Sequence, residues 1–337
     1  MSSSAASTSE RFLKGEDFKD DFRKALPREI VQHLARRSAW RASVAIVHDF
    51  AAIAVAIALA LACWPNPFVI LACVILTGTR QHALFVIAHD AAHYLLFENR
   101  TLNDLVGRLC ATVQGLSMCT YRVIHRLHHN NLYGELDPDT ALHGGYPRGR
   151  SYLVRKLLKD LSGLTAWKTY AYFLGGAPAL NTSTNVALRP LDDTSPKLKA
   201  DAVSDRNAVI VFHALALAFF AWSGYFVEYL VLWVLPLVTV VQAILRLRAI
   251  AEHGAVTDFS SPLTAARTNV APAWLEWLIF PHHVNYHIEH HLYASVPHYH
   301  LAGLHREMVK HGMLENAQVV PFRTTLSRIF SERPTSA

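Results

Sequence analysis

The sequence predicts an all-α integral membrane protein, with about four transmembrane helices in two hairpins and a cytoplasmic helical cap that holds a two-metal site. Three observations predict this fold. Hydrophobic residues make up 52% of the 337-residue chain and charged residues only 17%, below the quarter usual in soluble domains. Four apolar runs approach the length of a bilayer span. Three dense histidine clusters lie between and after those runs.

Residues 1–40 are expected to form an N-terminal tail and an interfacial segment. The chain begins Met-Ser-Ser-Ser-Ala-Ala-Ser and lacks the basic segment and apolar core of a secretory signal. Residues 41–330 are expected to form one membrane domain. Within it, no period of about 20 to 50 residues repeats, which argues against a solenoid.

The first predicted hairpin joins apolar runs at about 44–64 and 67–88. The sequence Trp-Pro-Asn-Pro at 64–67 separates them, because proline lacks an amide donor and clashes with the preceding helical turn. Polar residues at 77–82 interrupt the second run, including Arg80 and His82. We therefore expect the second helix to depend on neighbouring helices for cover.

The second predicted hairpin joins runs at about 208–223 and 225–245. Ser223 and Gly224 provide the turn, and Pro236 is expected to kink the second arm. Because each hairpin crosses the bilayer twice, all three histidine clusters are expected on one side. The short turns carry no Lys or Arg, so the histidine side is predicted to be cytoplasmic, with Arg80, Arg246 and Arg248 as interface markers.

Each histidine cluster spaces imidazoles three or four residues apart, which places them on one face of a helix. The clusters occupy 89–93, 125–129 and 287–291 and contain His89, His93, His125, His128, His129, His287, His290 and His291. Eight nitrogen ligands are too many for one ion and suit two. Ligand type leaves zinc, copper, iron and nickel open. Two iron ions are favoured because paired iron can activate dioxygen.

These three histidine boxes, their order and the two hairpins resemble the membrane fatty acid desaturase family over about residues 76–297. The resemblance implies a non-haem di-iron enzyme that uses O2 and two electrons to introduce a C=C bond into an acyl or sphingoid lipid chain. It implies that the eight box histidines are the metal ligands. A ninth ligand is expected shortly after the last transmembrane helix, where His253 stands.

Stearoyl-type members of that family carry an asparagine four residues before the ninth ligand, and this chain has Ala249 there. Either Asn285 or Glu252 could take its place. Metal-bound histidines usually donate their second ring nitrogen to a carboxylate or carbonyl group. The candidates for such outer partners and supporting groups are Asp90, Glu252, Asn285 and Glu289, together with Asp137 and Asp139.

Several further histidines lie near the boxes. His82 stands seven residues before His89, on the same face of a continuous helix, and is an open alternative as a ligand. The others are expected to point away from the metal site, and they are His282, His283, His298 and His300.

The spacing and composition of the boxes indicate which members of the family this chain resembles most. Three residues separate the histidines of the first box, which favours acyl-lipid, sphingolipid or related bacterial members over acyl-CoA types. The third box begins with His287 instead of Gln, unlike front-end desaturases. The cytochrome b5 motif His-Pro-Gly-Gly does not occur, so a separate electron donor is expected, either a ferredoxin or a cytochrome b5-type protein with its reductase.

Two other functions remain open from the sequence. A hydroxylase or ketolase acting on a lipid, alkane or carotenoid chain would share the same ligands. A zinc-dependent membrane hydrolase would need fewer histidines and one catalytic acid. Nucleic-acid binding is not expected despite the net charge of +6, because no basic stripe is interleaved with stacking aromatic residues. The expected partners are the membrane, a lipid substrate and the electron donor.

Overall fold

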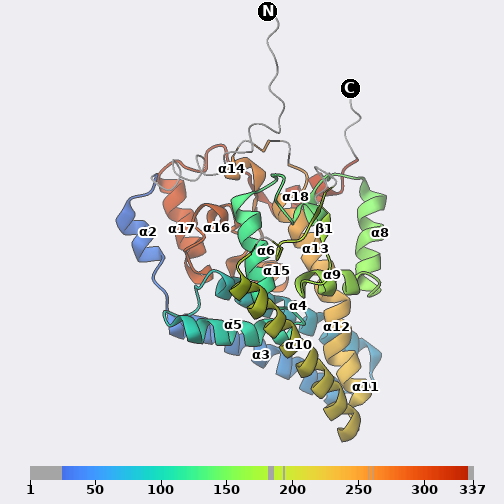
Figure 1. The fold of residues 1–337 in the computed structure, drawn as a ribbon. Coiled ribbons are helices and arrows are strands. Elements are labelled where there is room, and N and C mark those ends of the chain that lie inside the picture. Colours follow the sequence, from blue (N-terminus) through green and yellow to red (C-terminus); the bar gives the residue numbers. More distant parts are fainter. Residues whose placement is uncertain (1–24, 181–185, 193, 257, 260, 333–337) are drawn as a thin grey trace, which may run out of the picture.

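The computed structural model describes residues 25–180, 186–192, 194–256, 258–259 and 261–332. Long apolar helices form one end of the molecule and shorter helices form a cap at the other end (Figure 1). Four helical stretches of 24 to 28 residues are long and apolar enough to cross a membrane. The prediction of an all-α membrane protein with about four spanning helices is confirmed.

The first hairpin consists of α3 (Ala39–Ala62) and α4 (Pro67–Ala92). Asn66 starts α4, because its side chain accepts hydrogen bonds from the amides of Phe68 and Val69. Every residue of α4 from position 77 to its end is buried. The neighbouring helices therefore cover the polar half of α4, as its composition requires.

The second hairpin begins with α10 (Pro196–Ser223), which ends at Gly224 in the left-handed conformation with φ 83°. The return arm contains α11 (Phe226–Tyr229), a π-helical turn (Leu230–Val234), α12 (Leu235–Val238) and α13 (Val240–His253). Pro236 cannot donate a backbone hydrogen bond, and the π-helical turn immediately precedes it on the chain. The expected irregularity thus extends over 230–239.

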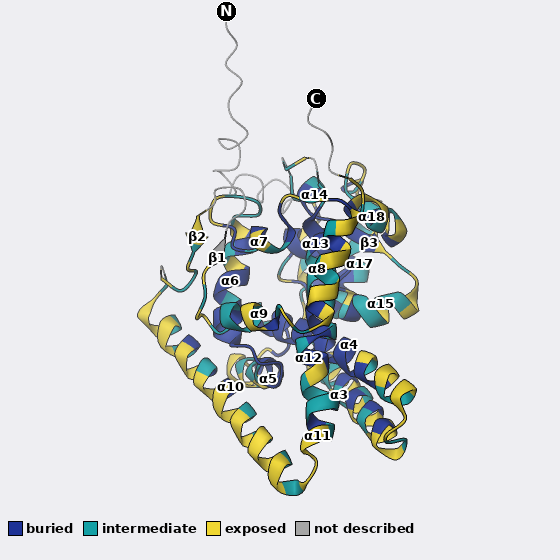
Figure 2. Ribbon diagram, turned by 90° about the vertical axis from the view of Figure 1, so that its right-hand side faces the viewer, coloured by how far each residue is buried: buried dark blue, intermediate teal, exposed yellow. Residues whose placement is uncertain are grey.

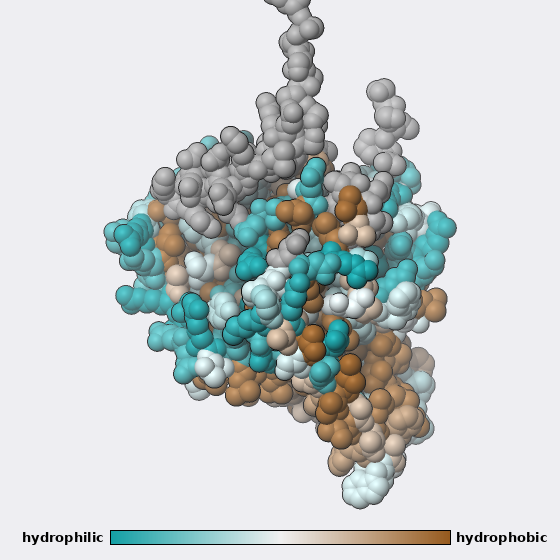
Figure 3. Space-filling model, viewed as in Figure 1, coloured by the Kyte–Doolittle hydropathy of each residue, from teal (hydrophilic) through white to brown (hydrophobic). Residues whose placement is uncertain are grey.

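Helix α10 differs from the other long helices because little of it is covered. Only Ala202, Asp205 and Val209 are buried on it (Figure 2). The surface around the far end of the two hairpins is mainly hydrophobic (Figure 3). Such an uncovered apolar surface suits contact with lipid chains.

The cap is built from short helices on both sides of the second hairpin in sequence. They are α5 (Arg100–Val113), α6 (Met118–Asn130), α7 (Thr140–His143), α8 (Arg150–Leu161), α9 (Ala166–Phe173), α14 (Pro262–Ala265), α15 (Ala273–Ile279), η3 (Pro281–His283), α16 (His287–Leu292), α17 (His298–Lys310) and α18 (Phe322–Ile329). α2 (Arg28–Leu34) packs against α17. β1 (Ala179–Leu180) pairs antiparallel with β2 (Ala187–Leu188), and β3 (Thr268–Val270) pairs parallel with β4 (Val319–Pro321).

The arginines expected to mark the membrane interface have other partners in the structure. Arg80 is 1% exposed, pairs with Asp49 of α3 at 3.3 Å and lies over the ring of Trp277. Arg246 pairs with Asp160, and Arg248 pairs with Glu252. Their position at the membrane interface stays a prediction. Arg80 thereby joins α4 to α3, Arg246 joins α13 to α8 of the cap, and Arg248 pairs within α13.

Candidate metal centre

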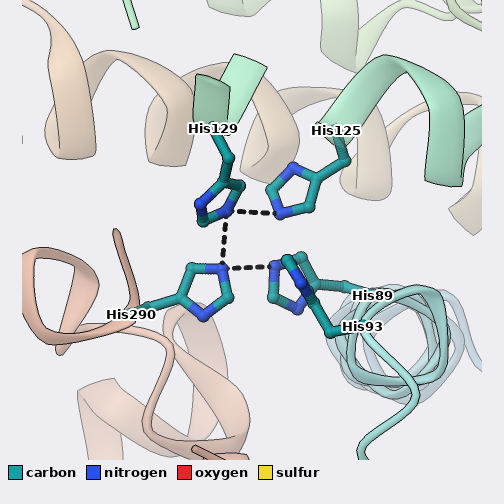
Figure 4. A group of neighbouring side chains, drawn as sticks. All are labelled: His89, His93, His125, His129 and His290. Atoms are coloured by element: carbon teal, nitrogen blue, oxygen red, sulfur yellow. Dashed lines mark hydrogen bonds between the residues drawn. The ribbon is translucent and has the colours of Figure 1, made fainter. Parts of the chain in front are cut away.

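A first group of five imidazoles gathers where α4, α6 and α16 meet. His89 and His93 come from the end of α4, His125 and His129 from α6, and His290 from α16. Their rings point toward one another (Figure 4). The Nε2 atom of His290 lies 3.0 Å from that of His89 and 2.9 Å from that of His129. Four of the five side chains are buried, and His93 is partly exposed.

A second group of four imidazoles lies beside the first and is fully buried. It contains His128 of α6, His253 at the end of α13, and His287 and His291 of α16. The Nε2 atom of His253 lies 3.2 Å from that of His128, 2.7 Å from that of His287 and 3.3 Å from that of His291. Residues of α6 and α16, which are distant in sequence, therefore converge on the Nε2 atom of His253.

The two groups share helices, and consecutive histidines belong to different groups. His128 and His129 are neighbours on α6, but a step of one residue turns the side chain by about 100° around the helix. His129 therefore joins the five-histidine group, while His128 joins the four-histidine group. In α16, His290 and His291 divide in the same way. Each box containing a double histidine thus contributes to both groups.

The hydrogen bonds around the four-histidine group indicate a cation between the rings. The Nδ1 atom of His128 donates to Asp137 at 2.9 Å, and the Nδ1 atom of His253 donates to the carbonyl of Ala265 at 3.3 Å. A neutral imidazole with a protonated Nδ1 has a lone pair on Nε2. The two lone pairs would face each other at 3.2 Å. A proton could bridge one such pair, but it could not serve all three rings around His253.

A match to a family model covers residues 65–323, and the description of that model is fatty acid desaturase. The matched region contains all nine clustered histidines, α4 of the first hairpin and the whole of the second hairpin. The chain belongs to the membrane fatty acid desaturase family. The resemblance found from the histidine boxes is confirmed.

Curated relatives from this family and related activities align with the chain at moderate identity. A probable fatty acid desaturase of Sorghum bicolor is 28% identical over 83% of this chain and 72% of its own length. A dihydrorhizobitoxine desaturase of Bradyrhizobium elkanii is 26% identical over 76% of this chain and 71% of its own length. A β-carotene 4-ketolase of Haematococcus lacustris is 30% identical over 32% of this chain and 35% of its own length.

Carboxylates support members of both groups in this desaturase. Asp90 lies 3.3 Å from Nδ1 of His89 and also holds His298 at 2.8 Å. Asp137 is the partner of His128. Glu252 pairs mainly with Arg248 at 2.6 Å, and its other oxygen lies 3.9 Å from Nδ1 of His287.

Two of the candidate supporting residues have their described contacts elsewhere. Asn285 donates to the carbonyl of Asn269 and to Glu276, both outside the clusters. Glu289 accepts a hydrogen bond from Thr268 at 2.6 Å and pairs with His305 at 2.5 Å. Glu289 thereby joins α16 to β3 and α17. The next residue, His290, belongs to the five-histidine group, but the turn of the helix directs the carboxylate of Glu289 to Thr268 and His305 instead.

The remaining nearby histidines do not join either group. His82 contacts Arg248 at 2.9 Å, and His282 contacts Asp49 at 2.6 Å. His298 is held by Asp90, and His300 lies 3.4 Å from Arg41. Among the described residues, His82 therefore contacts an arginine and belongs to neither histidine group.

One residue beside the site was not found by sequence reasoning. His143, at the end of α7, is 1% exposed and its ring centroid lies 4.9 Å from that of His253. It forms a third potential ligand group with His128 and Asp137. No other histidine lies within four residues of it, so the spacing that revealed the boxes gave no signal.

Burial keeps most of the clustered imidazoles neutral. It lowers the pKa of His125, His129 and His291 well below the usual value for histidine. Burial also opposes charge on His128, but the Asp137 carboxylate outweighs it and raises the pKa of His128 to about 9, so a metal ion would have to displace a proton from this ring. Neutral imidazoles supply the lone pairs that a metal ion needs. The donor set therefore fits two metal ions bound by nitrogen.

A cavity of about 110 Å³ reaches both groups from the side of α9 and α13. Its wall includes His128 and His253, and aromatic rings from Phe85, Tyr121 and Phe173. A separate cavity of about 360 Å³ borders the five-histidine group at the partly exposed His93. The metal centre can thus be approached from two sides.

Proposed function

We propose that this protein is a lipid desaturase that introduces a C=C bond into an acyl or sphingoid chain at a di-iron centre. The convergence of nine imidazoles into groups of five and four carries this proposal. Membership of the fatty acid desaturase family supports it.

The nine histidines are proposed as the ligands of two iron ions. His89, His93, His125, His129 and His290 would hold one ion, and His128, His253, His287 and His291 the other. Asp90 and Asp137 would fix the orientation of His89 and His128, because a carboxylate that accepts from Nδ1 leaves the Nε2 lone pair facing the metal. Glu252 would act on His287 in combination with Arg248.

When bound, the two iron ions would supply O2 activation and removal of hydrogen from an unactivated methylene group. The proposed net reaction converts –CH2–CH2–, O2, two electrons and two protons into –CH=CH– and two molecules of water. The aromatic walls of the inner cavity, formed by Phe85, Tyr121 and Phe173, suit an apolar chain.

The two electrons are proposed to come from a separate donor, either a ferredoxin or a cytochrome b5-type protein with its reductase. The four candidate spans support insertion in a membrane. We propose that the histidine groups lie on the cytoplasmic side, since arginines flank the ends of the hairpins on that side. Residues 41–330 are proposed as the membrane domain, preceded by an N-terminal segment at 1–40.

The direct test compares accurate-mass lipid profiles of cells that express this chain and cells that express His128→Ala. We expect a lipid lighter by two hydrogens only with the parent chain. His213→Ala is a matched control, because His213 contacts the carbonyl of Thr112 and belongs to neither group. Metal analysis of the purified parent should find two iron ions per chain. One zinc ion per chain would contradict the di-iron centre.

A second candidate function is oxygenation of the same kind of chain, as a hydroxylase or ketolase. The partial match to a β-carotene ketolase favours it. Hydroxylation would use the same electrons and protons, but one oxygen atom would enter the product and the other would leave as water. A product heavier by one oxygen in the lipid profile would replace the desaturase assignment while leaving the metal centre intact.

A further inference from the structure

The two histidine groups differ in the number of ligands that they offer. Five imidazoles converge in one group and four in the other. The four-histidine group offers one imidazole fewer, so an ion there would have room for one more ligand than an ion in the five-histidine group. Ala249 lies four residues before His253 on α13 and lines the inner cavity, but its methyl group cannot bind a metal or a water molecule.

His143 is a buried polar side chain beside this group, and it has no hydrogen bond. Its side chain is 1% exposed, and neither ring nitrogen has a hydrogen-bond partner. The closest carboxylate oxygen belongs to Asp137, 3.9 Å from Nε2, which is beyond hydrogen-bond distance. Burying an imidazole without a partner is unfavourable, so such a group in a folded protein usually indicates a missing ligand, ion or water.

The position of His143 indicates what the missing partner contacts. Its ring centroid lies 4.9 Å from that of His253 and 5.9 Å from that of His128. All three residues line the same cavity of about 110 Å³, which is large enough for several water molecules. Polar walls and two to four partners are the conditions under which buried water is held in place.

We propose that His143 holds, by a hydrogen bond, an exchangeable water ligand of the metal ion in the four-histidine group. This inference rests on the proposed di-metal function. His143 acts as a positioning residue in this arrangement: one ring nitrogen faces the water, which would occupy the position that Ala249 leaves open.

Azide is a suitable probe because it replaces an exchangeable water on ferric iron and can accept the same hydrogen bond. Azide binding would be titrated by its charge-transfer absorption in the purified, oxidised, iron-loaded protein. We expect His143→Leu to keep two iron ions per chain but to weaken azide binding by about tenfold, the effect of one hydrogen bond to a charged ligand. His143→Gln retains a donor and should bind azide nearly as tightly as the parent. His213→Leu is the control with no expected change.

The outcomes separate this inference from the proposed function. Equal azide affinity in the parent and in His143→Leu, with two iron ions in each, would overturn only the role of His143. Loss of one iron ion from His143→Leu would make His143 itself a ligand and would also overturn the water-mediated role. A parent protein that takes up no iron would remove the proposed function and this inference together. Thermal unfolding of each variant checks that the fold is retained.

Discussion

The five-histidine group offers more imidazoles than the four-histidine group, and it is also the more exposed of the two. The larger group includes the partly exposed His93 and borders an outer cavity of about 360 Å³. The smaller group is fully buried, and members of both groups line the inner cavity beside aromatic rings. The group with fewer imidazoles is therefore the one whose side chains are all buried. In a buried, low-dielectric site, one hydrogen bond to a ligand has a larger effect than it would in water.

Their supports differ as well. His89 of the larger group is held by Asp90, which also binds His298, and the ring of His298 lies 5.0 Å from that of His282. His282 in turn pairs with Asp49 inside the first hairpin. In the smaller group, His128 is held by Asp137 from the α6–α7 loop. These contacts connect the larger group to the first hairpin, whereas Asp137 connects the smaller group to the cap.

Removing one ligand from each group gives the largest expected effects. His253→Ala removes the atom on which three other imidazoles converge, and His290→Ala removes the corresponding centre of the larger group. Each variant should lose all desaturated product and retain about one iron ion per chain, because each group binds its own ion. Iron analysis and lipid profiling provide the measurements. Complete loss of both ions from either variant would mean that the two groups form one inseparable site.

The link to the first hairpin is tested by Asp49→Leu. Arg80 would then remain buried without its carboxylate, and we expect the free energy of unfolding to fall by about 3–5 kcal/mol. Replacing both residues, as Asp49→Leu with Arg80→Met, should recover much of this loss. Unfolding would be followed in detergent micelles. A single variant as stable as the parent would show that this ion pair does not support the fold.

The link to the cap is tested by Asp137→Asn. His128 would lose the carboxylate that fixes its Nδ1 proton, so metal affinity in the four-histidine group should fall by about 10- to 100-fold. Competition with a chelator measures this affinity. Asp139→Asn is the matched control, because its carboxylate is 3.9 Å from His128 and should contribute less. An equal effect of the two variants would point to general negative charge, not to the Asp137 hydrogen bond.

The smallest effect is expected for His298→Gln. His298 acts on the larger group only through Asp90, so the metal affinity there should fall by less than about tenfold. The same chelator competition applies, with His300→Gln as a control that lies outside this chain of contacts. A loss of metal affinity larger than that caused by Asp137→Asn would show that the indirect contact through Asp90 matters more than the direct contact of Asp137 with His128.

The arrangement of spanning helices followed from local sequence. Runs of apolar residues with proline and glycine at their ends predict hairpins because a helix in lipid must satisfy its own backbone and expose apolar side chains. The polar second half of α4 indicated that other helices would cover it, and they do. The partners of Arg80 and Arg246 could not be read in this way, since Asp49 and Asp160 lie far from them in sequence.

The sequence by itself determined that histidines three and four residues apart share helical faces, and the order of the boxes indicated the desaturase family. It did not determine which imidazoles meet. Only the tertiary structure separates His128 from His129 and brings His253 to both His128 and His287. The same packing takes Glu289 away from the clusters and brings His143 beside them. Periodicity fixes direction within one helix, whereas contacts between helices depend on how separate segments pack in space.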